Sequence, residues 1–153
     1  MAEKNDNRRE GVSPETDALA SELMGDALDL MASGESVDVL LAVEDVAGNV
    51  ASYVFSDDGA EACLEGARAH VRRLATAHGD ENSQLGDPIR YALTYEGAVD
   101  ADEDGSFVDA LLLEFGEKGW RAYSAYSLVD GKGTGDGFSW TEPAAAGEME
   151  PLL

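Results

Sequence analysis

The sequence contains few of the residues that most often carry out chemistry in proteins. Among 153 residues there is one cysteine, Cys63, and there are 2 histidines. A single cysteine excludes an intramolecular disulfide, and so few sulfur and imidazole ligands leave no credible zinc site. A lone free cysteine fits a reducing compartment, so we expect a cytoplasmic protein.

Long apolar runs are also missing. No apolar stretch approaches the roughly 20 residues that a membrane-spanning helix needs, and the polar N-terminus lacks the apolar core of a signal peptide. We therefore expect neither a membrane segment nor a secretory leader.

Basic residues are scarce. Ten lysines and arginines face 32 acidic residues, which gives a formal net charge of −22. Nucleic acids and anionic membranes are polyanions, so the charge argues against both as partners. It favours basic proteins, cationic peptides and cations. Acid-rich composition also arises as a bulk adaptation to salt, so the charge alone assigns no function.

What the sequence does contain is a globular core, since 44% of its residues are hydrophobic. We expect a disordered tail over residues 1–12, a single domain over 13–141 and an exposed tail over 142–153. Ser13-Pro14 is typical of a helix start, and apolar residues follow at spacings of three and four. A second amphipathic helix is predicted from Asp58 to Gly79.

Segments rich in β-branched and aromatic residues predict five strands and a short sixth one. They are residues 37–45, 49–57, 89–96, 107–115, 120–129 and, at the edge, 138–140. Turn residues join most of them as hairpins, so the sheet should be mostly antiparallel. With both helices on one face, the predicted fold is an α+β two-layer sandwich with the order α-β-β-α-β-β-β.

One short acidic segment resembles a calcium loop. Asp100, Asp102 and Asp104 alternate and Gly105 follows, as in the first half of such a loop. The position that should supply a bidentate carboxylate is Leu111, and the flanks are strands. A hairpin turn explains the same residues, so the turn is favoured and weak calcium binding by these aspartates is the alternative.

Two other patterns do not support a site. The glycine-rich residues 130–137 contain Lys132 as their only base and lead to no helix, so a mobile loop is expected rather than a phosphate cradle. Cys63 and His70 are seven residues apart on the second helix. Two turns separate them by about 10 Å along the axis, too far for a nucleophile–base pair.

The aromatic residues are concentrated in the C-terminal half, within predicted strands. They are Tyr91, Tyr95, Phe107, Phe115, Trp120, Tyr123, Tyr126, Phe138 and Trp140. Most of these rings should fill the core, but rings on a sheet face without a helix would form a protein interface or a dimer surface.

We therefore expect a non-catalytic protein-binding or self-associating module, with a protein partner or a homodimer, no catalytic residues and no cofactor. A weak divalent-cation module through the aspartate loop is one alternative. An enzyme that uses carboxylates is another, although 32 acids make any chosen pair uninformative. DNA mimicry by a negative surface is a third.

Overall fold

A computed structural model describes residues 8–35, 38–56, 59–100 and 105–153. The elements in order are α2 (Pro14–Ala32), β1 (Val39–Asp45), β2 (Val50–Phe55), α3 (Ala60–Ala77), the 3-10 helix η1 (Glu81–Ser83), β3 (Pro88–Val99), β4 (Val108–Glu117), β5 (Ala122–Asp130), the 3-10 helix η2 (Gly135–Gly137), β6 (Ser139–Trp140) and β7 (Ala144–Met149). The α+β class and the predicted order are confirmed, and β6 and β7 follow. The expected strand ends at residues 37 and 57, and Asp58, lie outside the described residues.

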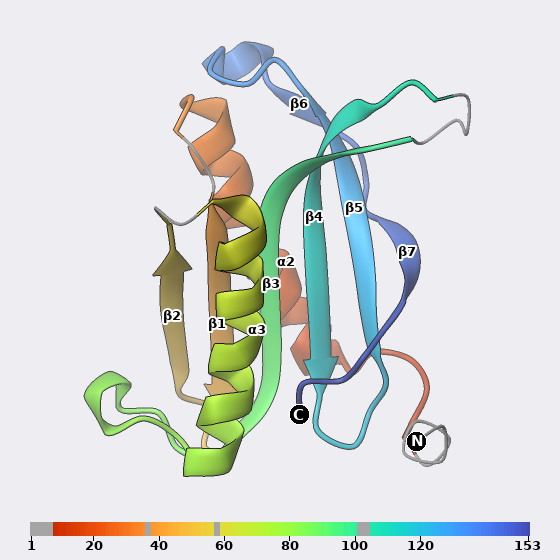
Figure 1. The fold of residues 1–153 in the computed structure, drawn as a ribbon. Coiled ribbons are helices and arrows are strands. Elements are labelled where there is room, and N and C mark those ends of the chain that lie inside the picture. The colour runs from red at the N-terminus through yellow and green to blue at the C-terminus, as the bar shows by residue number, and fades with distance from the viewer. Residues whose placement is uncertain (1–7, 36–37, 57–58, 101–104) are drawn as a thin grey trace.

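All the strands belong to one curved sheet (Figure 1). The strand order is β2-β1-β3-β4-β5-β6, and β7 pairs with β5 beside β6. Every pairing between these strands is antiparallel, in a sheet predicted to be mostly so, and an isolated bridge between Arg9 and Trp120 is parallel. Because β1 pairs with β3 as well as with β2, the strand β2 lies at the end of the sheet. In the described residues, neither helix combines the length and the hydropathy that crossing a membrane requires.

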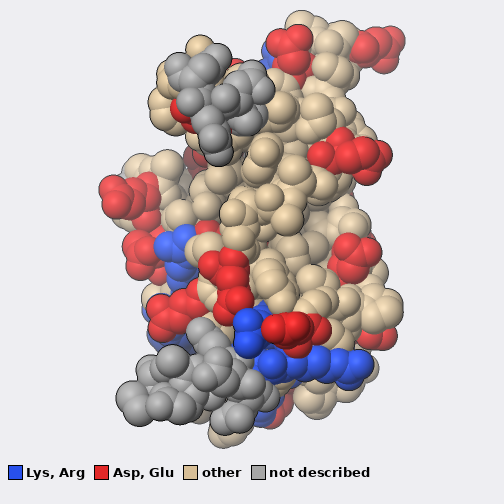
Figure 2. All heavy atoms as spheres, turned by 90° about the vertical axis from the view of Figure 1, so that its right-hand side faces the viewer, with Lys and Arg blue, Asp and Glu red and all other residues tan. Residues whose placement is uncertain are grey.

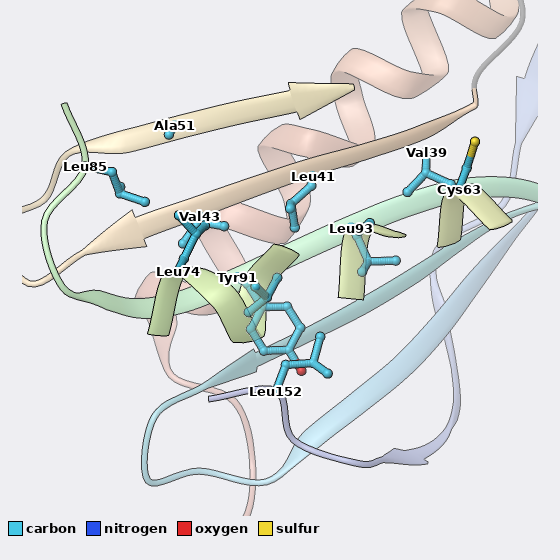
Figure 3. Close-up of a cluster of buried hydrophobic side chains, with 12 residues drawn as sticks. Val39, Leu41, Val43, Ala51, Cys63, Leu74, Leu85, Tyr91, Leu93 and Leu152 are labelled. Atoms are coloured by element: carbon cyan, nitrogen blue, oxygen red, sulfur yellow. The ribbon is translucent and has the colours of Figure 1, made fainter. Parts of the chain in front are cut away.

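The helices lie on opposite faces of the sheet, whereas the sequence analysis placed both on one face (Figure 1). Leu41 and Leu93 form one core with α3, and Figure 3 shows this cluster. On the other face Ala42 and Ala92 pack against α2, and a further cluster joins α2 to β4 and β5. The reason lies in β1, which has apolar side chains on both faces, as a strand covered on both sides does.

The start of α2 is fixed by its cap and by a contact with β4. The Ser13 hydroxyl accepts a hydrogen bond from the backbone N–H of Thr16 (3.1 Å), which confirms the predicted N-cap. The hydroxyls of Ser13 and Thr16 also donate to Glu117 Oε1, at 2.5 and 2.7 Å. The residues that cap α2 therefore also bind the end of β4.

Tails were expected over 1–12 and 142–153, but the described residues of both chain ends, from residue 8 and over 142–153, make contacts with the domain. Residues 144–149 form β7 on β5, and Leu152 is buried beside Tyr91 in the core under α3 (Figure 3). The physical reason is that β7 satisfies backbone groups along β5, while Leu152 covers apolar surface next to Tyr91. At the other end, Arg8 donates to the main-chain oxygens of Trp120 (2.9 Å) and Leu153 (2.6 Å).

Candidate binding surfaces

The strands on either side of the acidic segment, β3 and β4, pair with each other in an antiparallel arrangement, and residues 101–104 between them lie outside the described residues. Val99 pairs with Val108 across it, and the N–H of Gly105 donates to Asp100 Oδ2 at 2.8 Å. Asp102 and Asp104 lie outside the described residues, so calcium binding there stays a prediction. Within the described ranges, no three or more His, Cys, Asp or Glu side chains gather as a metal ion would require.

The glycine-rich segment 130–137 contains η2 and leads to the short strand β6. Its only base, Lys132, binds Glu96 through Nζ at 2.8 and 3.1 Å. The adjoining cavity of about 290 Å³ is also lined by Asp109 and Asp130. An anionic group such as phosphate would meet these carboxylates, so the segment has no cradle for one.

Cys63 and His70 serve different parts of the α3 core. Cys63 is buried among apolar side chains. The His70 ring lies edge-on to Tyr53, with centroids 4.4 Å apart, and to Phe55 at 5.9 Å. Burial, and then the charge of Arg73, lower the pKa of His70 below its usual value. Neither residue is placed to activate the other.

The most buried glutamate is Glu114, and it is bound by a cation. Arg68 donates to both its oxygens, from Nε at 3.0 Å and from Nη2 at 2.5 Å, and the Tyr95 hydroxyl donates at 3.1 Å. Burial and the neighbouring Glu114 carboxylate raise the pKa of Tyr95 to about 12. The group borders a cavity of about 210 Å³ between α3, β4 and the C-terminal segment. A carboxylate with this many partners is typical of a structural network.

Two other carboxylates, Asp45 and Glu117, have pKa values below the usual ones. Burial alone would raise the pKa of Asp45, but hydrogen bonds from Gly86, Asn49 and Ala47 outweigh it and lower the pKa. Burial opposes ionisation of Glu117 in the same way, and its hydrogen-bond donors lower its pKa. Such carboxylates shape turns and helix ends, and they are poor proton donors at neutral pH.

The two helices cover different strands: α2 contacts β1, β3 and β4, and α3 contacts β1, β2 and β3. Each end of the sheet therefore has one face that no helix covers. On the α3 side, β4, β5 and β7 continue beyond α3. By strand register, the apolar side chains of this face that keep some exposure are Val108, Leu112, Tyr126, Leu128 and Ala144, and Ala110 lies buried among them. We call the five residues other than Ala110 the open face. Val108 is 37% exposed, Ala144 is exposed, and the others are half-buried.

The side of the molecule next to the open face carries little charge. Figure 2 views the molecule from the side of β5 and β7. Uncharged residues form the upper part of its centre, with acidic side chains around and below them and basic side chains near the lower end. Ala144 to Gly147 in β7 are all exposed and uncharged. In a chain of net charge −22, an uncharged area of this kind differs from what the overall composition would suggest.

At the opposite end of the sheet, β2 is bare on the α2 side. Val50 and Val54 are 52% and 68% exposed there, and Ser52 lies between them. We call Val50, Ser52 and Val54 the β2 strip. The strip was not predicted: residues 50–55 are uncharged and have apolar side chains on both faces, but this composition does not show which of the two faces stays uncovered.

Few of the aromatic residues that were predicted as a possible interface lie on the open face or the β2 strip. Tyr91 is buried, and Trp120 is covered by the Arg9 guanidinium, 4.4 Å from the ring centroid. Tyr126 lies half-buried on the open face, while Phe107 and Trp140 are exposed elsewhere. Aliphatic side chains therefore form most of the bare surface.

Together these features define an α+β protein whose antiparallel sheet has one helix on each face and a bare apolar surface at each end. Comparison of this chain with protein-family models, with curated proteins and with solved structures gives no match.

Proposed function

We propose that the protein is a non-catalytic binding module that holds a protein partner on the open face. The observation that carries the proposal is the offset of α3, which leaves Leu112, Tyr126 and Leu128 without a covering element. Apolar sheet surface of this kind is usually buried in globular proteins, and where it stays exposed it marks an interaction site.

The dimensions of the open face fit an element of another protein. Neighbouring strands are about 4.8 Å apart, so β4, β5 and β7 span about 10 Å. One α-helix with its side chains has a diameter of about 10–12 Å. A partner helix would therefore lie beside α3 and complete the layer that α3 begins.

Two observations favour binding over catalysis by carboxylates. The buried Glu114 is paired with Arg68, and Asp45 and Glu117 have lowered pKa values. The cavity beside Glu114 holds about 210 Å³, below the roughly 300 Å³ at which small-molecule sites begin. The open face, in contrast, is a broad strand surface.

Site-specific photocrosslinking in cells that express the protein tests the proposal. The variant Tyr126→benzoylphenylalanine should give discrete adducts, because the probe lies at the centre of the open face. The matched control is Asp29→benzoylphenylalanine, on the exposed side of α2, which should give none of these adducts. Equal labelling at both positions, or none at position 126, would remove the proposal. Sedimentation of the purified protein shows whether it forms a homodimer, and so distinguishes a second copy from a different partner.

A further inference from the structure

The strand β2 has the composition of an interior strand but the position of an edge strand. Ala51, Tyr53 and Phe55 face α3, and Val50 and Val54 lie on the opposite face. Apolar side chains on both faces are typical of strands with neighbours on both sides. Edge strands usually carry a charge, a proline or a bulge that prevents further pairing. The six residues of β2 contain no charge and no proline, and their register with β1 is unbroken.

The backbone of the β2 strip points away from β1. Asp45 N–H donates to the carbonyl of Asn49 at 2.9 Å, and hydrogen-bonded pairs alternate along an antiparallel ladder. Ala51, Tyr53 and Phe55 therefore pair with β1. The N–H and C=O groups of the β2 strip point outward over about 13 Å. In the described chain no strand pairs with this edge.

The acidic residues of α2 lie next to the β2 strip. Glu22 and Asp26 are one helical turn apart, and they line a hollow of about 100 Å³ together with Val50 and Ser52. Every charged residue of α2 is acidic. The basic residue nearest in the sheet pairing, Arg90, is already bound to Glu44 and Glu117. Val50 thus lies beside two carboxylates that form no ion pair with a lysine or arginine of the described residues.

We propose that the outer edge of β2 pairs with a cationic strand of another protein, in which arginine or lysine alternates with apolar residues. The basic side chains would lie on the valine face, with their aliphatic stems over Val50 and Val54 and their charged ends at Glu22 and Asp26. The apolar side chains would extend the layer of Tyr53 and Phe55 under α3. Backbone hydrogen bonds to the strip would supply the pairing.

The charge of the chain selects this occupant over a second copy. Two copies would bring together two molecules of formal net charge −22 each, and net charge of this size keeps proteins monomeric. A cationic strand gains attraction from the same charge. The β2 strip is separate from the open face, so it extends the proposed binding function to the other end of the sheet.

Titration with a labelled peptide of alternating arginine and valine tests the proposal. The control peptides are an isomer of the same composition with the arginines in one block, and a copy of the alternating peptide N-methylated at every second residue. Both keep the charge, and each should bind about tenfold more weakly or worse, because pairing needs the alternation and the backbone N–H groups. Equal affinity for all three peptides would mean charge attraction alone and would overturn the proposal.

Two protein variants locate the binding. Val54→Lys places a positive charge on the β2 strip, and Ser52→Pro removes one outward N–H without removing a bond to β1. Each should lower the affinity for the alternating peptide about tenfold or more. Val12→Lys makes the same change at an exposed valine outside both surfaces and should leave the affinity unchanged. If Val54→Lys leaves the affinity unchanged, or if Val12→Lys lowers it as much as Val54→Lys does, the β2 strip is not the site.

Hydrogen exchange in the full-length wild-type protein gives a readout that does not depend on the variants. The amides of Val50, Ser52 and Val54 should exchange rapidly in the free protein and become protected when the alternating peptide binds. Those of Ala51, Tyr53 and Phe55 should be protected in both states. Peptide binding without new protection would overturn the proposal. Protection of the strip in a concentrated sample without peptide, with a dimer in sedimentation, would identify a second copy as the occupant and would also overturn it.

Discussion

At the scale of single residues, Glu117 connects the start of α2 to the sheet. It accepts hydrogen bonds from Ser13, Thr16 and Arg90. We predict that Glu117→Gln lowers the free energy of unfolding by about 1.5–3 kcal/mol at neutral pH, as loss of hydrogen bonds to a charged group does. Urea unfolding measures it. Glu148→Gln, on the exposed strand β7, is the control and should change the stability by less than about 1 kcal/mol.

The same substitution has a predictable pH dependence. Because the pKa of Glu117 is lowered in the folded protein, its stabilising effect is complete above the unfolded-state value of about 4.5 and is lost as the pH falls through the lower folded-state value. The difference between wild type and Glu117→Gln should therefore shrink below about pH 4.5. A difference of the same size at pH 7 and at pH 3 would contradict this assignment.

The sequence predicted some of these residues and not others. The cap at Ser13 follows from local chemistry, since serine before proline is typical of a helix start. Leu111, which stands where a calcium loop would need a bidentate carboxylate, was expected to be flanked by strand residues, and it is fully buried in β4. Glu114 and Glu117 were not singled out, because their partners Arg68 and Ser13 lie far away in sequence. With 32 acidic residues, only the fold shows which are buried.

At the scale of elements, His70 on α3 packs against two aromatic rings of β2. The ring lies between α3 and the rings of Tyr53 and Phe55, and Arg73 Nη2 is 3.0 Å from its Nδ1. The pKa of His70 is lowered, so the unfolded chain takes up this proton more readily than the folded one. Stability from the neutral ring is present above about pH 6.5 and is lost as the pH falls toward the folded-state value.

We predict that the free energy of unfolding of the wild type decreases between pH 8 and pH 5.5, and that His70→Gln reduces this decrease. The exposed His78 provides the matched control, since His78→Gln should keep the wild-type dependence. Denaturant unfolding across this range measures all three proteins. The idea fails if both variants follow the wild-type pH dependence.

A second prediction at this scale concerns the C-terminal segment. Leu152 is 8% exposed and packs in the core under α3. Leu152→Ala should lower the free energy of unfolding by about 2–3 kcal/mol, the lower part of the range for buried leucines. Val12→Ala, at a position 40% exposed, is the control and should have little effect. An equally small effect at Leu152 would show that the segment does not contribute to the core.

Most elements could be predicted from local pattern, and the exceptions have one cause. Strands such as β1 and β2 are rich in β-branched and aromatic residues, which favour strands on their own. The strand β7 is mainly alanine and glycine, so its strand conformation depends on pairing with β5. The side on which each helix packs is also set by tertiary contacts. Neither the open face nor the β2 strip could therefore be located from the sequence.

At the scale of the whole molecule, the formal net charge of −22 acts against the compact state. We predict that sodium chloride raises the free energy of unfolding in urea. Most of the gain should come below about 0.15 M, where the Debye length falls from about 30 Å at 0.01 M to about 8 Å. A gain that appears only at molar salt would reflect excluded-solute effects rather than screening, and no gain would mean that the acids do not repel one another appreciably.

The opposite placement of the two helices has a geometric consequence. The open face is on the α3 side at one end of the sheet, and the β2 strip is on the α2 side at the other end. The sheet would separate two ligands bound there, and the ligands would lie on opposite sides of the molecule. A ternary complex could then assemble in either order, with the protein as a rigid spacer between its neighbours.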